Sequence, residues 1–510
     1  ITFIGPSPEM LRLFGDKTAA RTLANECNVP VLAGSERASD VGVAKAFLAS
    51  LGPKGAVMVK AVAGGGGRGM RVARSEAELE EAWARSSSEA RAAFGNGELY
   101  VEELISEARH IEVQIVGDGQ EVVQLGEREC TLQRRHQKLV EIAPSPSLSP
   151  ALREKITAAA VALAGKVGYR SLGTFEFLVD AAHGDRFVFI EANPRLQVEH
   201  TVTEAVTGVD LVRTQIRIAR GETLAGIGLT QANAPAPRGY AIQLRINMET
   251  MQADGGALPA GGEITAYEPP GGAGIRVDGF GYAGYRTSAA FDSLLAKLIV
   301  HDPSPDFAAA VTAVRRALRE FRIEGVKTNA AFLGALLARD DVAANDVTTR
   351  FIDIHAPDLV KAANEQPAGA FFAGNATAAA TSRAAAQGPA GTEAVTAPMA
   401  GLVVAVEVQE GQEVRAGATI AVLEAMKMEH VIQATVSGIV RRVDAEKGEV
   451  LNPDQAIVHI EPAHVEHESE DEAAAVDPDA IRPDLADSIA RHKLTLDESR
   501  PEAVARRDVG

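Results

Sequence analysis

A stretch of low complexity in the last third of the chain excludes a single continuous fold. Residues 362–392 read AANEQPAGAFFAGNATAAATSRAAAQGPAGT, with many Ala and Gly and few large aliphatic side chains. Such a segment cannot bury enough apolar surface to offset the chain entropy that is lost on ordering. A chain of 510 residues is also too long for one core, since cores rarely grow past roughly 250 to 300 residues. We therefore predict a flexible linker over residues 356–392, with separate domains on either side.

The two sides of this linker differ in their patterning. From Lys17 to about residue 355, strand-like apolar runs alternate with amphipathic Ala-rich segments, which is typical of a layered α/β or α+β fold. Residues 393–461 contain short β-branched runs separated by glycines, which predicts a small all-β domain. This domain contains a weak internal repeat: APMAGLVVAVEVQEGQEV and ATVSGIVRRVDAEKGEVL share the order small residue, Gly, paired aliphatics, Gly, acid, Val. The two halves would meet at a turn that contains Lys427. The acidic run HVEHESEDEAAAVDPD predicts a second linker, because like charges repel.

Composition excludes several classes of protein. A formal net charge of -18 argues against a nucleic-acid partner, because phosphate binding needs clustered Lys and Arg. The two cysteines, Cys27 and Cys130, form neither a disulfide framework nor a zinc motif, which favours a reducing, cytoplasmic setting. No apolar stretch approaches the roughly 20 residues that a bilayer span requires, so we expect no membrane partner. The first residues, ITFIGPSPEM, lack an initiator Met, and we expect the chain to start within a domain.

The small β domain presents one lysine at its centre. In AVLEAMKMEHVIQA, one strand ends and the next begins around Lys427, which is flanked by two Met. An isolated M-K-M is most simply a surface lysine beside methionines that fill a gap. Its position at the joint of the internal repeat instead favours a rigid hairpin tip that another enzyme recognises.

EAMKMEH, together with the upstream APMAG, resembles the biotinyl domain of the biotin carboxyl carrier family. Lipoyl domains share this fold, but their modified lysine usually follows an acid directly, whereas Lys427 lies between Met426 and Met428. The resemblance covers most of residues 393–461 and implies biotin, rather than lipoate, on Lys427.

A glycine-rich run lies in the first part of the chain. VMVKAVAGGGGRGMRVARSEAELEEAW satisfies the G-x-G-x-x-G pattern through Gly64, Gly66 and Gly69. MRVA then continues as strand and the next helix begins only after Ser75, which disfavours a dinucleotide-binding turn. No Gly-Lys-Ser/Thr closes the run, so it is not a Walker A loop either. Two interpretations remain: a merely flexible loop, or a glycine hairpin over a triphosphate, with Lys60 supplying positive charge.

Polar residues recur at alternate positions on the predicted strands. ARHIEVQIVGDG places His110, Glu112 and Gln114 on one face of a strand. GTFEFLVD and RFVFIEANPR read as a hairpin in which Glu176 and Glu191 stand among large apolar residues. Two such carboxylates can hold Mg²⁺ against nucleotide phosphates, or they can simply be exposed acids on a half-buried sheet.

The residues that follow resolve this choice. The run EANPRLQVEHTVTEAVTG, preceded by ERECTLQRRHQKLVE, strongly resembles the biotin carboxylase family of ATP-grasp enzymes. The resemblance extends from FIGPSPEMLRLFGDKTAA to about His355. It implies an α+β multidomain protein, in which an N-terminally truncated ATP-grasp biotin carboxylase domain precedes a small all-β biotinyl/lipoyl-like barrel-sandwich domain. The implied divisions are 1–30 (remnant of the N-terminal subdomain and connecting helices), 31–105 (lid subdomain), 106–355 (core and C-terminal subdomain), 356–392 (linker), 393–461 (biotinyl domain) and 462–510 (acidic linker and start of a carboxyltransferase region).

Site residues follow from the same resemblance, motif by motif. It implies ATP contacts at Lys17, Lys60, Gly65, Gly66, Gly67, Glu102, His110, Gln133 and His136. It implies Mg²⁺ or Mn²⁺ ligands at Glu176, Glu191 and Asn193, and bicarbonate contacts at Lys138, Arg195, Gln197 and Val198. Of these, Lys138 and Arg195 are also expected to be catalytic, together with Glu199 as the base and Arg245 as the arginine that steadies biotin.

The implied activity is ATP- and bicarbonate-dependent carboxylation of biotin on Lys427. The implied partners are a biotin protein ligase and a carboxyltransferase domain or subunit, and the full-length protein is expected to be a homo-oligomer. The biotinyl domain directly follows the carboxylase, unlike in single-chain pyruvate carboxylases, and RPDLADSIARHKLTLDESRPEAVARR resembles the opening of an acyl-CoA carboxyltransferase domain. These two features favour a single-chain, long-chain acyl-CoA carboxylase of fatty acid metabolism.

Other interpretations stay open at this point. The chain can be the same portion of a pyruvate, urea, propionyl-CoA or methylcrotonyl-CoA carboxylase. It can also serve a different ATP-grasp ligation, or be a biotin carrier scaffold with an inactive ATP-grasp domain.

Overall fold

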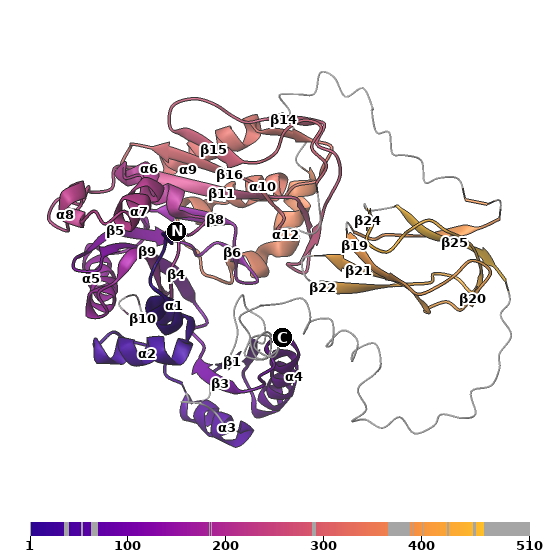
Figure 1. Cartoon of the computed structure of the whole chain (residues 1–510), viewed down its shortest axis with the longest axis horizontal. Coiled ribbons are helices and arrows are strands. Elements are labelled where there is room, and N and C mark those ends of the chain that lie inside the picture. Colours follow the sequence, from indigo (N-terminus) through magenta and orange to yellow (C-terminus); the bar gives the residue numbers. More distant parts are fainter. Residues whose placement is uncertain are drawn as a thin grey trace, which may run out of the picture.

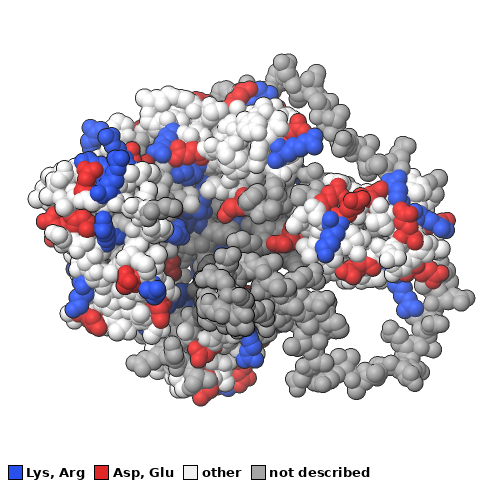
Figure 2. All heavy atoms as spheres, in the orientation of Figure 1, with Lys and Arg blue, Asp and Glu red and all other residues white. Residues whose placement is uncertain are grey.

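The computed structural model describes residues 2–34, 40–52, 55–62, 70–182, 184, 186–287, 292–365, 388–389, 391–399, 401–425, 428–451 and 455–463. A large body of helices and sheets occupies the chain up to residue 365, and a small all-β domain begins at Glu393 (Figure 1). None of the described helices has the length and apolar character that a bilayer span requires. Figure 2 shows acidic and basic side chains lying beside one another on both parts, so the visible face of neither is uniformly basic.

An eight-stranded sheet forms the centre of the large body, in the order β10-β9-β4-β5-β8-β11-β16-β15. Its strands are β4 (Ala108–Asp118), β5 (Val122–Glu129), β8 (Val140–Ala143), β9 (Arg170–Asp180), β10 (Phe187–Asn193), β11 (Tyr240–Asn247), β15 (Ile275–Gly279) and β16 (Leu294–Asp302). Every neighbouring pair is antiparallel. This sheet confirms the layered α+β expectation and the predicted hairpin of GTFEFLVD with RFVFIEANPR.

Helices cover both faces of this sheet. On one face, α1 (Pro8–Gly15), α2 (Lys17–Glu26) and α5 (Pro150–Lys166) pack against β4 and β9, around an aromatic cluster made by Phe14, Tyr169, Phe175, Phe177 and Phe189. On the other face lie α6 (His200–Thr207), α7 (Leu211–Ala219) and α8 (Leu224–Ile227). Because side chains alternate along a strand, the apolar residues of β4 face α5 while its polar residues face α6.

The second half of the sheet packs against helices from the end of the large body. These are α9 (Phe307–Glu320), α10 (Ala330–Leu337), α11 (Asp340–Ala343) and α12 (Phe351–Glu365). Short strand pairs complete the body: β6 (Gln133–Arg134) with β7 (Gln137–Lys138), β12 (Glu249–Met251) with β13 (Ala257–Pro259), and β14 (Ala266–Glu268) with β17 (Arg322–Glu324).

Helix α12 corrects the predicted start of the linker. It continues to Glu365, and its Ala356 and Leu359 are buried, so the first ten residues assigned to the linker belong to the large body. The prediction rested on a change in composition, which does not locate the end of a helix. Residues 366–387 lie outside the described residues.

A smaller sheet, in the order β2-β1-β3, carries the residues around the glycine run. It consists of β1 (Val57–Ala61), β2 (Arg71–Ala73) and β3 (Leu99–Glu103), packed with α3 (Val41–Ser50) and α4 (Glu76–Phe94). As predicted, the chain continues as strand after the glycines, and Ser75 caps α4 by accepting from the Glu78 amide. The glycines predicted to contact ATP, Gly65, Gly66 and Gly67, lie outside the described residues.

The small domain consists of two four-stranded sheets, β18-β25-β23-β20 and β22-β21-β19-β24. The strands are β18 (Glu393–Thr396), β19 (Gly401–Val406), β20 (Glu413–Val414), β21 (Thr419–Ala425), β22 (Met428–Gln433), β23 (Gly438–Val443), β24 (Val450–Leu451) and β25 (Ala456–Pro462). The internal repeat is visible in the pairing, because β19 and β20 of the first half correspond to β23 and β24 of the second. The short strand β24 pairs with β19, and the short strand β20 pairs with β23, so each half pairs with the short strand of the other. β21 and β22 pair up to Ala425 and Met428, and Lys427 between them lies outside the described residues.

Candidate active site

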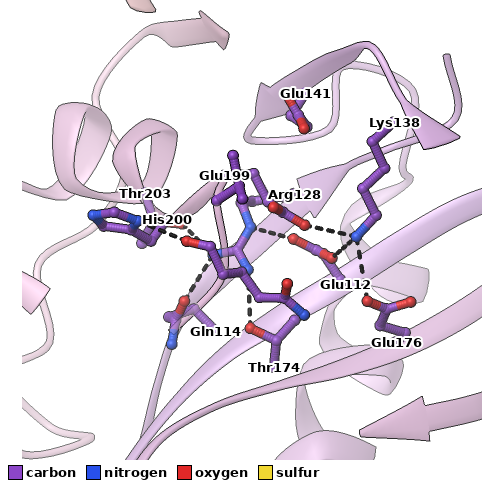
Figure 3. A network of polar contacts seen from close by, with 12 residues as sticks. Glu112, Gln114, Arg128, Lys138, Glu141, Thr174, Glu176, Glu199, His200 and Thr203 are labelled. Atoms are coloured by element: carbon purple, nitrogen blue, oxygen red, sulfur yellow. Dashed lines mark hydrogen bonds and ion pairs between the residues drawn. The ribbon is translucent and has the colours of Figure 1, made fainter. Parts of the chain in front are cut away.

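A lysine ammonium surrounded by three buried carboxylates lies where the polar face of the central sheet meets the start of α6. Lys138 Nζ donates to Glu112 Oε2 at 2.6 Å and to Glu199 Oε1 at 2.7 Å. It also donates to Glu176 Oε1 at 3.2 Å. Each carboxylate side chain is at most 6 % exposed. Figure 3 shows the ammonium directed between them.

Sheet register and helix start bring these groups together. Glu112 on β4 stands directly opposite Glu176 on β9. Glu199 immediately precedes α6, and Lys138 ends the short strand β7. Two carboxylates side by side on neighbouring strands repel each other, so the arrangement depends on a cation between them.

A second cation approaches Glu199 from the other side. Arg245 Nη2 on β11 donates to Glu199 Oε2 at 3.0 Å, while its Nε contacts the buried Glu141 of β8. Gln243 holds the second oxygen of Glu141 at 3.0 Å. Both oxygens of Glu199 are therefore engaged, one by Lys138 and one by Arg245.

The predicted pair of acids, Glu176 and Glu191, stands together because of a β-bulge. Phe189 pairs with Phe177, but Glu191 then pairs with Glu176, so Ile190 is an extra residue on β10. Since successive side chains point to opposite faces, this insertion turns Glu191 to the face of Glu176. Without it, Glu191 would stand opposite a phenylalanine of the aromatic cluster.

Asn193 joins these two acids. Its Nδ2 donates to Glu176 Oε1 at 3.0 Å and to Glu191 Oε1 at 3.2 Å. The oxygens of Glu176, Glu191 and Asn193 are hard ligands of the kind Mg²⁺ prefers, so the chemistry of this donor set fits the metal that the sequence implies. On its other side, Glu176 Oε2 contacts His110 Nε2 at 2.8 Å, and Gln133 lies 3.5 Å from His110 Nδ1.

Two further groups of carboxylates, His and Cys lie close enough to hold a metal ion, judged by geometry among the described residues: His110, Glu112 and Glu176, and Glu112, Cys130 and Glu199. Lys138 already donates to all three of these glutamates. The ammonium thus accounts for the clustering of the acids at this position.

A second cluster contains the residues predicted to hold nucleotide phosphates. Glu102 on β3 is buried and contacts both Lys60 of β1 and Arg21 of α2. Burial raises the pKa of Glu102, but the two cations outweigh it and bring the pKa below the usual value. Burial lowers the pKa of Lys17, and the adjacent Lys60 lowers it further, against the attraction of Glu191 and Glu102. Lys17 is thus within electrostatic range of Lys60, Glu102 and Glu191.

The predicted bicarbonate residues after β10 form a loop of their own. Arg195 is exposed and donates from Nη1 to the Gln197 side chain at 3.0 Å. The Val198 carbonyl accepts from Lys297 Nζ at 3.0 Å.

His136, predicted to contact ATP, is exposed and has a φ of 67° at the turn between β6 and β7, close in sequence to Lys138.

Burial and charge determine the protonation of the cluster. Burial raises the pKa of Glu112, but Arg128 and Lys138 outweigh it and hold the pKa at about 2. Lys138 and His110 do the same for Glu176, whose pKa is also about 2 despite its burial. Burial would lower the pKa of Lys138, yet the surrounding anionic groups raise it well above the ordinary lysine value. At neutral pH the ammonium and its partners Glu112 and Glu176 are charged.

Four residues of these clusters were not predicted as site residues. They are Glu112, which bridges Lys138 and Arg128; Arg128 itself; Glu141, which holds Arg245; and Arg21, which holds Glu102. The alternation on ARHIEVQIVGDG did place Glu112 on a polar face. Nothing in the sequence alone distinguishes Arg128 or Glu141 from ordinary charged residues of a strand.

Comparison with known proteins shows the family to which the chain belongs. Residues 16–227 match the family described as carbamoyl-phosphate synthase L chain, ATP binding domain. Residues 243–354 match the biotin carboxylase C-terminal domain, and residues 393–460 match the family described as biotin-requiring enzyme. The biotin carboxylase domain of 2-oxoglutarate carboxylase from Hydrogenobacter thermophilus, solved with MgADP, ADP and bicarbonate, is 43% identical, with a TM-score of 0.66 over 71% of this chain and 77% of that chain. The chain belongs to the biotin-dependent carboxylases.

Relatives of this carboxylase differ in how much of the chain they match. Pyruvate carboxylase from Staphylococcus aureus is 47% identical over 364 residues, which is 70% of this chain and 31% of the relative. The chain thus spans about a third of the length of the curated relatives it matches. The structure of a single-chain, multi-domain long-chain acyl-CoA carboxylase is 38% identical, with a TM-score of 0.60, and covers 99% of this chain and 44% of that chain. The expected fold, an ATP-grasp biotin carboxylase followed by a biotinyl domain, is confirmed.

The depressed pKa of Glu112 predicts how this carboxylase loses stability in acid. Because the folded-state pKa of about 2 lies below the unfolded value of about 4.5, the ionised Glu112 stabilises the fold above pH 4.5, and this contribution is lost as the pH falls towards 2. Glu112→Gln should therefore unfold more easily at pH 7, by roughly 3 kcal/mol, and the difference should shrink as the pH falls from 4.5 to 3.

Denaturant unfolding at pH 7, 4.5 and 3 checks this expectation, with the exposed Glu154→Gln on α5 as the control that stays within about 0.5 kcal/mol of the wild type. A Glu112→Gln difference that is constant with pH would contradict the assignment of the ion pairs.

Proposed function

We propose that this chain uses ATP to carboxylate biotin attached to Lys427, with bicarbonate as the source of the carboxyl group. The observation that carries the proposal is the buried cluster in which Lys138 and Arg245 hold the two oxygens of Glu199. Such an arrangement places a base between two cations, which suits the binding and deprotonation of a small oxyanion.

The ATP side of the reaction falls to two sets of residues. Lys60 and Lys17 supply positive charge for the phosphates, and Arg21 with Glu102 holds Lys60 in place. Glu176, Glu191 and Asn193 would hold Mg²⁺, which supplies charge neutralisation at the transferring phosphoryl group. The register between β9 and β10 keeps these three donors together.

The bicarbonate side falls to Lys138, Arg195 and Glu199. Arg195, which is exposed on the loop before α6, offers a guanidinium fork of the shape that a planar oxyanion binds. Glu199 takes the proton of bicarbonate, and Lys138 stabilises the negative charge on the oxygen that then attacks the γ-phosphate of ATP. The bond from the γ-phosphate to ADP breaks, so ADP leaves and carboxyphosphate forms. Lys138 is already charged and already directed at Glu199, so no rearrangement of charge precedes the reaction.

Arg245 serves the acceptor of the carboxyl group. Its Nε is held by Glu141 and its Nη2 by Glu199, which orients the guanidinium plane beside the base. Carboxyphosphate breaks down into CO₂ and phosphate, and the phosphate is basic enough to take the ureido proton of biotin. Biotin, when bound, would supply the nitrogen that accepts the CO₂, and Arg245 would stabilise the negative charge there. Lys427, which lies between β21 and β22 in the sequence, would receive biotin from a biotin protein ligase.

We further propose that the final acceptor is an acyl-CoA, reached through a carboxyltransferase that the full-length protein supplies. Two facts support this: the biotinyl domain follows the carboxylase directly, and the long-chain acyl-CoA carboxylase structure covers 99% of this chain. A specific observation favours pyruvate as the second candidate, because pyruvate carboxylases are the relatives with 46% to 48% identity. Their matches cover at most 70% of this chain.

Replacement of the attachment lysine tests the first proposal. Full-length Lys427→Arg, expressed with a biotin ligase, should carry no biotin by intact mass, while its ATP hydrolysis in the presence of bicarbonate and free biotin should persist. Lys447→Arg, at an exposed lysine of the same domain, should retain biotin as the wild type does. Biotin still bound to Lys427→Arg would refute the assigned site.

The acceptor is tested by incorporation of ¹⁴C-bicarbonate into a panel of acceptors. With ATP and Mg²⁺, the full-length protein should incorporate ¹⁴C into an acid-stable product at least about tenfold faster when long-chain acyl-CoA is the acceptor than when pyruvate is. A rate difference of this size needs a difference of only about 1.4 kcal/mol in activation free energy. Faster labelling of pyruvate would overturn the acyl-CoA assignment and leave the carboxylase assignment intact.

A further inference from the structure

Arg128 is a fully buried arginine beneath the cluster of Lys138. It is the largest of the described side chains that are completely shielded from solvent. Taking a guanidinium out of water is unfavourable, and replacing a buried ion pair by apolar residues often stabilises a protein. A stability role alone therefore explains its presence poorly.

The contacts of Arg128 reach three different elements of the fold. Its Nε contacts Glu112 on β4, and its Nη1 donates to Gln114 on the same strand at 2.8 Å. Its Nη1 also donates to Thr203 on α6 at 3.0 Å, and its Nη2 to Thr174 on β9 at 3.0 Å. The planar fork thus joins two strands of the sheet to the helix that follows Glu199 (Figure 3).

Two of these contacts, those to Glu112 and Thr203, connect Arg128 to a proposed reacting group through one intervening group. Glu112 accepts from Arg128 with one oxygen and from Lys138 with the other, so the guanidinium determines where the second oxygen points. Thr203 lies in the first turn of α6, the helix that begins directly after Glu199. Its hydrogen bond to the same guanidinium fixes how closely the start of α6 approaches the sheet. Arg128 contacts neither Lys138 nor Glu199 by hydrogen bond, yet both depend on it.

We propose that Arg128 is a positioning residue for bicarbonate activation, which holds Lys138 through Glu112 and Glu199 through α6. This inference rests on the proposed biotin carboxylase function. The charge and the shape of the guanidinium contribute separately to this positioning: the charge balances Glu112, and the planar fork connects β4, β9 and α6. The contacts around Lys60 and Glu102 share no partner with Arg128, so ATP binding should be independent of it.

Two variants separate these parts. Arg128→Lys keeps the charge beside Glu112 but cannot reach Gln114, Thr174 and Thr203 at once. Thr203→Val keeps Arg128 and the side-chain volume, and removes only the tether to α6. Arg153→Lys is the matched control, because Arg153 on α5 pairs with the buried Glu127 at 2.7 Å on the opposite face of the sheet.

The experiment is steady-state ATP hydrolysis by the full-length protein with free biotin, with bicarbonate and ATP varied separately. Arg128→Lys should raise the KM for bicarbonate and lower kcat/KM for bicarbonate by at least about tenfold, with the KM for ATP within about twofold of the wild type. Thr203→Val should lower kcat/KM for bicarbonate by about threefold or more. Arg153→Lys should change neither KM.

The outcomes are distinguishable. Unchanged bicarbonate kinetics in Thr203→Val and Arg128→Lys, or KM values for bicarbonate and ATP that rise together, would overturn the positioning role. If Arg128→Lys fails to fold, Thr203→Val decides alone, because it leaves every charge in place. Absence of bicarbonate-stimulated hydrolysis in the wild type would instead refute the proposed function itself.

Discussion

The ammonium of Lys138, shared among three buried carboxylates, is the interaction on which the rest of the active site depends. Glu112, Glu176 and Glu199 come from two strands and a helix start, and their mutual repulsion would separate these elements if no cation lay between them. The cluster continues outwards in alternating charge, to Arg128 beyond Glu112 and to Arg245 beyond Glu199. A network of this kind is strong only when every member is satisfied, so its geometry is specified sharply.

The sheet supplies the rigidity that this network needs. Its antiparallel strands place apolar side chains against α5 on one face and polar side chains beneath α6 on the other, so the core and the site are built on alternate residues of the same strands. The bulge at Ile190 is the one irregularity that brings Glu191 beside Glu176. A site built on strands in this way holds its groups more precisely than a site built on loops. Arg195, one of the residues proposed to bind bicarbonate, lies instead on an exposed loop.

Much of this arrangement was predictable from the sequence, because alternation along a strand is a local property. It placed Glu112 on a polar face and joined Glu176 and Glu191 in one hairpin. The bulge was not predictable, since register depends on how two strands meet. Arg128 was missed because an arginine between two glutamates reads as exposed, and its burial follows only when α6 and β9 close over it. The linker was predicted to start too early, because a change in composition does not locate the end of a helix such as α12.

The most direct test of the account is bicarbonate-dependent ATP hydrolysis by full-length Lys138→Met, with free biotin as acceptor. Methionine keeps the apolar stem of lysine and removes only the charge that the three carboxylates share. The account predicts a loss of at least about 100-fold in bicarbonate-dependent turnover, with ATP still bound, because the base and the attacking oxygen lose their common cation. Turnover within a few-fold of the wild type would contradict the claim that this cluster is the catalytic centre.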